Sequence, residues 1–318
     1  MGNVGPGIAY KHLLSVTNTL LERVSDTRVI RILDVGCGDG GLIAFLIEHL
    51  SKFCPSRIFE VVGLDVHDFG VEFDESLGKT IEFLSAKFPD ISWSERISAI
   101  SVFDEWPYPD EYFDFIVSNH VIEHVEDHAF FFSQVRRTLR EGGFSVHLFP
   151  LQECVYEAHL RLPIAHWIKN HDLLRAYIKW LSWCGLGKFK AKSKGLFTKQ
   201  SLDKYAEQRA DFLLHFTNYI RYSDVVTLAK KHHLRITFMY TWQFYWQKIR
   251  TTVGLGGSYK YSSRTSAVMN WLAFMLLRRL SSVTMILEKR ETLRGKLFHR
   301  YRLPVAVGCT KHAGSRDR

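Results

Sequence analysis

Short apolar runs that alternate with segments of helical periodicity constrain the fold of this 318-residue chain more than any other feature. Strands that are apolar throughout are buried on both faces, which is typical of a parallel sheet covered by helices. Right-handed crossovers between such strands give a doubly wound α/β sheet. The expected strands are residues 29–35, 58–64, 96–102, 113–118 and 144–149, and the expected helices are residues 8–24, 41–53, 74–88 and a fourth that follows residue 118 and ends at 140.

The alternation stops after Pro150 and resumes near residue 222, which predicts an insertion into the sheet domain. Residues 151–187 are rich in His, Trp and Leu and predict helices without strands, and residues 188–197 predict a basic loop. Insertions at the carboxyl edge of a sheet usually cover the ligand site. We therefore expect an N-terminal helix (1–28), a ligand-binding α/β core (29–150), a helical cap (151–197, with 221 as an alternative end), the rest of the core (198–250, with a helix over 222–233 and a strand over 234–242) and a separate basic region (251–318).

Charge is divided unevenly along the chain, although the net charge is +9. Residues 188–318 contain 26 Lys and Arg against 7 Asp and Glu, whereas residues 1–187 contain 16 against 26. This asymmetry indicates an anionic partner for the second half, with a solvated basic surface as the simpler alternative. Five scattered cysteines without a C-x-x-C pair favour a reducing compartment, and the N-terminus lacks a secretory leader pattern. We therefore expect a cytoplasmic protein.

One apolar segment, residues 267–287, is long enough to span a bilayer. Arg278 and Arg279 lie at its centre, and each costs about 2.5–3.5 kcal/mol there, against a gain of about 0.3–0.6 kcal/mol per apolar residue. The two sums nearly cancel, so we reject a transmembrane helix. A helix lying peripherally on the inner membrane surface and an ordinary core or dimer helix are the two alternatives. The aromatic segment 240–246 (YTWQFYW) fits either an aromatic-lined pocket or packing on the sheet, and we favour packing.

The turn after the first expected strand carries the strongest functional signal. Gly36, Gly38 and Gly40 remove side chains, so a ligand can approach the backbone, and Asp65 ends the second strand where it can accept hydrogen bonds from a ribose diol. The spacing is G-x-G-x-G instead of the G-x-G-x-x-G of dinucleotide sites. Acidic residues on both sides of the glycines disfavour a pyrophosphate and suit a cationic ligand. The turn therefore favours S-adenosylmethionine over NAD.

Four segments in this order resemble the motifs of class I S-adenosylmethionine-dependent methyltransferases, in particular the small-molecule branch with the ubiquinone- and menaquinone-biosynthesis enzymes: LDVGCGDG, VVGLDV, WPYPDEYFDFIVSNHVIEHV and LREGGFSVHLFP. The resemblance covers residues 30–150 well and 198–245 loosely, and it implies a mostly parallel, seven-stranded, Rossmann-like sheet. It also implies that Asp34, Gly36, Cys37 and Gly38 line the methionine part of the cofactor, that Asp65 holds the ribose, that Val66 lies against the adenine and that Asn119 lies beneath the sulfonium.

The sequence departs from the family pattern after the third strand. Relatives often have an Asp there that meets the adenine amino group. Here the simplest alignment places Val102 at that position, followed by Phe103, with Asp104 as an alternative partner for the adenine.

Transfer of a methyl group to a hydroxyl needs a base that takes the proton. The candidates are His120, after the fourth strand, and Glu157, His159 and His166 at the start of the cap. Histidine is the usual base near neutral pH, and we rank His159 first. The alternative is that these side chains only pack the cap.

A metal site is a second hypothesis for the segment after the fourth strand. His120, Glu123 and His124 fall at i, i+3 and i+4, which would share one face of a helix. Some methyltransferases that resemble this chain bind a divalent metal through a Glu-x-x-Glu-His version of this spacing, which Asp127 or His128 could supplement here. We favour a structural role for these residues and predict no metal.

The end of the fourth strand also bears on the acceptor. Enzymes that methylate exocyclic base nitrogens typically carry an N-P-P-Y-like motif there, and this chain has Ser118-Asn119-His120-Val121. We therefore predict O-methylation of a small-molecule, glycan or glycolipid hydroxyl. Methylation of RNA bound by the basic half is an alternative. A catalytically silent scaffold is disfavoured, because the glycine turn and Asp65 are intact.

Overall fold

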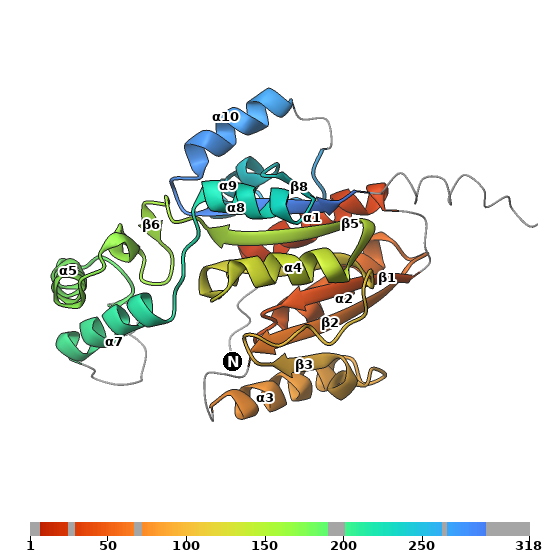
Figure 1. Ribbon diagram of the computed structural model, residues 1–318, viewed down its shortest axis with the longest axis horizontal. Helices are drawn as coiled ribbons and strands as arrows, with labels where there is room; N and C mark the ends of the chain where they lie inside the picture. The colour runs from red at the N-terminus through yellow and green to blue at the C-terminus, as the bar shows by residue number, and fades with distance from the viewer. Residues whose placement is uncertain (1–6, 25–28, 67–71, 190–200, 263–265, 291–318) are drawn as a thin grey trace, which may run out of the picture.

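The computed structural model describes residues 7–24, 29–66, 72–189, 201–262 and 266–290. Seven strands form one sheet in the order β3-β2-β1-β4-β5-β9-β8 (Figure 1). The strands from β3 to β5 in this order are all parallel to their neighbours. Strand β9 is antiparallel to both of its neighbours, β5 and β8. The predicted doubly wound, mostly parallel, seven-stranded sheet is confirmed. The strands are β1 (Val29–Val35), β2 (Ile58–Val66), β3 (Ile97–Ile100), β4 (Phe113–Asn119), β5 (Leu139–Pro150), β8 (Leu234–Thr237) and β9 (Ser282–Lys289).

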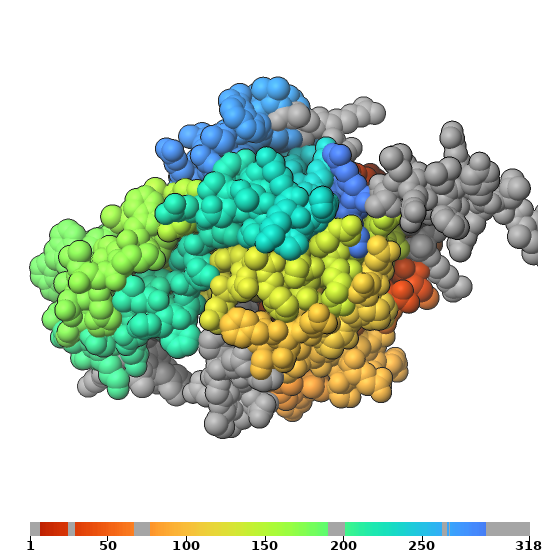
Figure 2. Space-filling model, in the orientation of Figure 1, coloured from red at the N-terminus to blue at the C-terminus, as the bar shows by residue number. Residues whose placement is uncertain are grey.

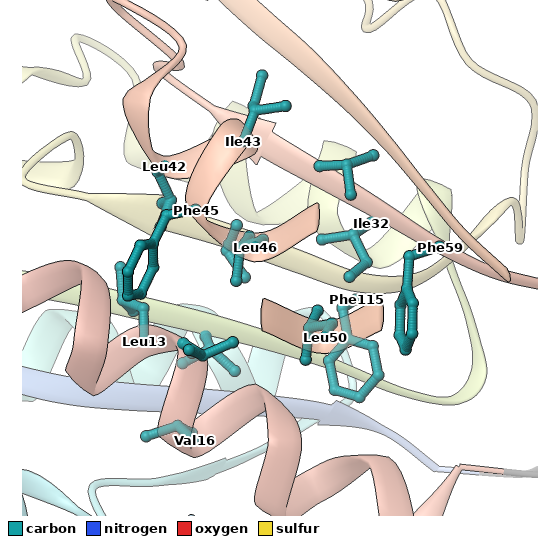
Figure 3. Packing of buried hydrophobic residues seen from close by; sticks show 14 of the residues in the cluster. Leu13, Val16, Ile32, Leu42, Ile43, Phe45, Leu46, Leu50, Phe59 and Phe115 are labelled. Atoms are coloured by element: carbon teal, nitrogen blue, oxygen red, sulfur yellow. The ribbon is translucent and has the colours of Figure 1, made fainter. Parts of the chain in front are cut away.

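Helices cover both faces of the sheet because its strands are apolar on both sides. In β1, Ile30 and Ile32 join the cluster beneath α1, α2 and α3, whereas Leu33 and Val35 join the cluster beneath α4 and α8. Figure 3 shows the first cluster, in which side chains of α1 and α2 pack on the central strands. The helices around the sheet are α1 (Ile8–Leu20), α2 (Gly41–Phe53), α3 (Glu72–Lys87), α4 (His128–Thr138), α8 (Tyr222–Lys231), α9 (Thr241–Thr252) and α10 (Ala267–Leu277).

The cap lies beyond the carboxyl ends of the central strands (Figure 1). Helices α5 (His171–Trp183) and α7 (Leu202–His215) pack on one another around an apolar cluster of their own. The prediction of helices without strands is wrong for this region, since β6 (Tyr156–Glu157) and β7 (Leu162–Pro163) form a short antiparallel hairpin. The predicted cap boundary at residue 197 is also wrong, because α7 belongs to the cap cluster, and the alternative end at 221 agrees with the start of α8.

The predicted end of the sheet domain at residue 250 is wrong as well. Residues 267–287 divide into α10 and most of β9, and β9 is inserted between β5 and β8. The first six residues of β9 are all buried. The second part of the apolar run therefore belongs to the core of the sheet, and the first part forms a helix that packs on it. No helix among the described residues is long and apolar enough to cross a membrane.

Two further predictions fail locally. The strand expected over 234–242 ends at Thr237. The aromatic segment that follows enters α9, and its Tyr240 and Phe244 pack on the core of the sheet, as interpreted. The helix expected directly after β4 begins only at His128, because the Asp127 side chain accepts a hydrogen bond from the Phe130 N–H and caps it. Residues 120–127 form a loop that contains a 3₁₀ turn, Ile122–His124.

Candidate active site

A pocket of about 300 Å³ opens at the carboxyl ends of β1 to β4. This edge is where ligands bind in doubly wound sheets. Its walls come from the strand ends, the loop after β3 and the segment from His120 to the first turn of α4. The lining residues are Val35, Gly36, Leu64, Asp65, Val66, Ile100, Val102, Trp106, His120, Val121, His124, Val125, Glu126, Asp127, Phe130 and Phe131.

The glycine turn fixes the floor of the pocket. The Gly36 N–H donates to the Leu64 carbonyl at 2.7 Å, which ties β1 to β2 at the point where both end. Gly36 has a φ of 69°, and a Cβ atom there would lie 2.3 Å from Cγ2 of Val121. Glycine is therefore required at position 36 both by the backbone conformation and by the space.

Asp65 links the turn to β2. Its Oδ2 accepts from the Gly38 N–H at 2.7 Å and its Oδ1 accepts from the Val66 N–H at 2.8 Å. Burial raises its pKa, although both hydrogen bonds act in the opposite direction. Each oxygen keeps further acceptor capacity, which is what a ribose diol would use.

Asp34 gives the pocket its electrostatic character. This side chain is fully buried behind the turn, and its Oδ2 has no hydrogen-bond partner. Burial, and then the negative charges of Asp65 and Asp39, raise the pKa of Asp34 well above its ordinary value. The raised pKa reflects the lack of a counter-charge, and a cationic group bound nearby would supply that charge and favour the carboxylate form. The residues of the turn therefore fit a ligand with an amino group and a sulfonium, as S-adenosylmethionine has.

Some of the predicted cofactor-binding residues line the pocket, and others lie next to it or outside it. Gly36, Asp65, Val66 and Val102 line the pocket. Asp34, Cys37, Gly38 and Asn119 lie next to it, in the turn or at the strand ends, and Oδ1 of Asn119 is buried without a partner. Phe103 points away, with 65% of its surface exposed, and Asp104 caps its own loop by accepting from the Ser101 N–H.

Sequence reasoning missed most of the apolar wall. Trp106, Phe130 and Phe131 line the pocket and pack together, with the Trp106 and Phe131 rings edge to face at 5.6 Å. The aromatic content of these segments was the available signal. That signal does not show which way these side chains point, because their orientation depends on where β4 ends and α4 begins.

His120 stands at the mouth of the pocket in a strained conformation. Its φ is 57°, in the left-handed region that non-glycine residues rarely adopt. The Nδ1 atom lies 3.0 Å from Oε1 of the fully buried Glu123, and Oε2 of Glu123 has no partner. The loop thus holds an imidazole against a buried carboxylate beside the ligand.

The cap contributes a second imidazole–carboxylate pair. His159 Nδ1 donates to Oε1 of Glu157 at 2.7 Å, and the Tyr219 hydroxyl donates to the same oxygen at 2.9 Å. The backbone N–H of Leu160 donates to Oε2. Burial opposes ionisation of Glu157, but the hydrogen bonds and the neighbouring imidazole outweigh it, so its pKa is lowered and it is a carboxylate.

The two sides of the site meet at His124 and His159. Their Nε2 atoms lie 3.1 Å apart, with the rings edge to face. The Nδ1 atom of His124 donates to the Phe216 carbonyl at 2.6 Å, and that of His159 donates to Glu157. In the neutral state of both rings, each Nε2 therefore carries a lone pair directed at the other.

His166, the fourth predicted catalytic residue, does not reach the pocket. It is buried with Nε2 against the Gln152 carbonyl at 3.2 Å, and its ring packs on Tyr219 at a centroid distance of 4.6 Å. Burial lowers its pKa, so it is a neutral side chain behind Tyr219. His166 thus contacts Tyr219, which donates to Glu157, and like Glu157 and His159 it does not line the pocket, so its catalytic role stays a prediction.

The metal hypothesis also needs a different set of residues from the one predicted. The helical face expected for His120, Glu123 and His124 does not exist, because these residues lie in the loop before α4. Within the described ranges, two groups bring His and acidic ligand atoms within 4.8 Å of one another: Glu123, His124 and His159 at the pocket, and His171, Glu207 and Asp211 on the cap.

Comparison with known proteins identifies the family of the chain. A family model described as a methyltransferase domain matches residues 10–212, which is more than half of the chain. A probable S-adenosylmethionine-dependent methyltransferase of Mycolicibacterium smegmatis is 33% identical over 112 residues, covering 35% of this chain and 35% of the relative. A non-reducing polyketide synthase, ausA, of Penicillium brasilianum is 28% identical over 135 residues, covering 42% of this chain and 5% of the relative.

The chain thus spans only 35% of the length of the mycobacterial relative and 5% of that of the polyketide synthase. Among solved structures, the YcgJ protein of Bacillus subtilis is 13% identical and superposes over 88% of this chain and 99% of its own, with a TM-score of 0.45. The match of the family model, together with the acidic glycine turn, defines the class: the chain belongs to the methyltransferase-domain family of enzymes that use S-adenosylmethionine.

Proposed function

We propose that this methyltransferase acts on a hydroxyl group of a small-molecule, glycan or glycolipid acceptor, and that the His124–His159 pair takes up the acceptor's proton. The observation that supports the proposal is the hydrogen bonding of the pair. Both Nδ1 atoms donate to fixed acceptors, so both Nε2 atoms are proton acceptors, 3.1 Å apart. His124 lines the pocket, so the pair is accessible from the cofactor side.

Bound S-adenosylmethionine supplies an electrophilic methyl group on a positively charged sulfur. As the acceptor oxygen bonds to the methyl carbon, the carbon–sulfur bond would break and neutral S-adenosylhomocysteine would leave. The acceptor's proton would pass to the pair, between its two Nε2 atoms. An N–H···N hydrogen bond then replaces two opposed lone pairs. The Glu157 carboxylate, hydrogen-bonded to His159, stabilises the positive charge that the pair acquires.

A second candidate is methylation of a carbon acid. The partial match to a polyketide synthase supports it, and a carbon acid must also give up a proton to a base. Methylation of RNA by the basic half is the third candidate function. In that case the binding of RNA would weaken steeply as the salt concentration rises.

The product identifies the acceptor atom. The enzyme is incubated with S-adenosylmethionine labelled with ¹³C in the methyl group and with fractions of neutral glycans, glycolipids, phenolic small molecules and RNA. The ¹³C shift of the transferred methyl distinguishes an ether from a C-methyl or an N-methyl product. An ether in the glycan, glycolipid or small-molecule fraction is expected, and a C-methyl or nucleic acid product would contradict the proposal.

The role of the pair is tested by His159→Gln, which keeps a donor for Glu157 and removes the base. The expected result is a fall in kcat of about 10²–10⁴-fold, the usual contribution of a positioned base. Affinity for S-adenosylhomocysteine should stay unchanged, because His159 does not line the cofactor pocket. Turnover is measured by release of S-adenosylhomocysteine.

The matched control is His171→Gln. His171 is also a cap histidine next to carboxylates, with Nε2 3.1 Å from Oδ1 of Asp211, but it lies on α5 outside the pocket. Full activity is expected. Equal losses in the two variants would indicate damage to the cap, and full activity of His159→Gln would remove the pair from the reaction. A strong chelator should leave turnover unchanged, since the pair binds a proton and not a metal.

A further inference from the structure

Helices α9 and α10 present an apolar surface that faces outward, which we call the α9–α10 face. On α9 the exposed apolar side chains are spaced by four, three and four residues, which places them on one stripe. The two helices contact one another, so the stripe of α9 adjoins the outer side of α10. The members, each between 45% and 75% exposed, are Trp242, Trp246, Ile249, Val253, Leu255, Val268, Met269, Trp271, Leu272, Leu276 and Leu280.

Folding of the monomer does not account for this face. The inner side of α10 is already anchored by Phe274 and Leu277, both buried, and the Phe274 ring stacks on Phe238 at 4.3 Å. A helix with one face on a core normally carries polar residues on the other. The α10 sequence AVMNWLAFMLL instead contains one polar residue, Asn270, so its outer side is built for contact with something apolar.

The charges around the face identify the partner. Residues 225–287 contain nine Lys and Arg and no Asp or Glu. Arg250 lies in the last turn of α9, next to Ile249 of the stripe, and Arg278 and Arg279 follow the last turn of α10. An apolar surface with three tryptophans, in a segment that carries basic but no acidic residues, is complementary to a bilayer with anionic headgroups, where Trp rings lie at the headgroup level.

The shape agrees with a surface position. Helix α10 has eleven residues and is therefore about 16 Å long, which is half of the hydrocarbon thickness of about 30 Å. It lies at the outer edge of the molecule, beyond the β8 end of the sheet (Figures 1 and 2). A short projecting helix can insert its outer side among lipids without spanning them.

We propose that the α9–α10 face docks this enzyme on an anionic lipid bilayer. The face continues toward the active site, because the N–H groups of Val155 and Tyr156 donate to the carbonyls of Arg279 and Leu280. Both side chains are exposed, and the hairpin that starts there carries Glu157 and His159. Docking would thus bring the cap hairpin close to the headgroups. This proposal does not depend on which atom is methylated.

The test is co-sedimentation of the full-length enzyme with vesicles. We expect binding to vesicles of phosphatidylglycerol and phosphatidylcholine in a 3:7 ratio, and at least tenfold weaker binding to phosphatidylcholine alone. The triple variant Trp271→Gln/Leu272→Gln/Leu276→Gln should lose at least tenfold of the binding to anionic vesicles. Its side chains are exposed, so its thermal unfolding and the shift with S-adenosylhomocysteine should match those of the parent.

The matched control is Trp180→Gln/Trp183→Gln. These tryptophans are also exposed, but they lie on α5 of the cap. Binding that persists in the α10 variant, or that falls equally in the α5 variant, would overturn the proposal. Light scattering at the same protein concentration measures whether the face binds a second copy of the chain instead. A dimer that the α10 substitutions dissociate, with no vesicle binding by the parent, would assign the face to a second copy of the chain and also overturn it.

Discussion

At the scale of single residues, the site depends on where carboxylates are left without a counter-charge. Asp34 is buried with one free oxygen, and Asp65 is held by two backbone N–H groups that orient both of its oxygens. The chain thus fixes the acceptors before a ligand arrives, which reduces the entropy lost on binding. These two side chains are the basis of the predicted contacts with a cationic group and with a ribose.

Replacing Asp65 tests this arrangement. In Asp65→Asn one backbone N–H, of Gly38 or Val66, must face an NH₂ group instead of an oxygen. The affinity for S-adenosylhomocysteine should fall at least tenfold, since a hydrogen bond to a charged group contributes about 1.5–3 kcal/mol. Calorimetric titration measures it, and Asp104→Asn is the control, because Asp104 lies outside the pocket. The reverse ranking of the two variants would show that the ribose contact is assigned to the wrong acid.

Sequence patterns identified those acids because glycine spacing and strand ends are local properties. They could not identify the His124–His159 pair, whose members are 35 positions apart and meet only when the cap docks on the loop after β4. The same spacing that suggested a helical face for His120 and His124 is compatible with a loop. Asp127, as the N-terminal cap of α4, decided between the two.

At the scale of elements, the assignment of residues 267–287 shows what pattern reasoning confuses. A continuous apolar run reads as one segment, but α10 stops at Leu277 and β9 begins at Ser282. Only the pairing of β9 with both β5 and β8 reveals that its apolar residues fill the interior of a sheet. The sequence of the segment alone does not predict that pairing.

Truncation tests the boundary. A chain that ends at residue 250 lacks β9, so β5 loses its neighbour and β8 loses its partner in the sheet. We expect this chain to be unfolded or insoluble. A chain that ends at Arg290 keeps every described element and should unfold cooperatively, with the same shift on adding S-adenosylhomocysteine. Circular dichroism and thermal melts measure both, and a folded chain ending at 250 would contradict the role of β9.

At the scale of the whole molecule, buried histidines tie stability to pH. His12 joins α1 to β9 through Thr284 at 2.7 Å, and His147 lies between Ser118 and Ser145 within the sheet. Burial lowers the pKa of both to about 3, with a further contribution from Lys248 for His12. Between pH 6.5 and about 3 the unfolded chain therefore binds more protons than the folded one.

Stability should accordingly fall as the pH drops below about 6.5, by up to about 1.4 kcal/mol per pH unit for each histidine. Urea unfolding between pH 7.5 and 4.5 measures the slope. In His147→Gln, which can still bond to both serines, the slope should decrease by about one proton. An unchanged slope would mean that His147 is not the group that titrates on unfolding.

The position of β9 also has a consequence for biosynthesis. This strand lies inside the sheet but is among the last parts of the fold to leave the ribosome, after both of its neighbours. Until then the edge of β5 has only open backbone groups, which invite pairing with other chains. The nascent polypeptide therefore cannot close its sheet stepwise during translation. Completion of the sheet requires β9 to pair with β5 and β8 after both have been synthesised, so we expect the yield of folded protein to be sensitive to chaperones and to premature release.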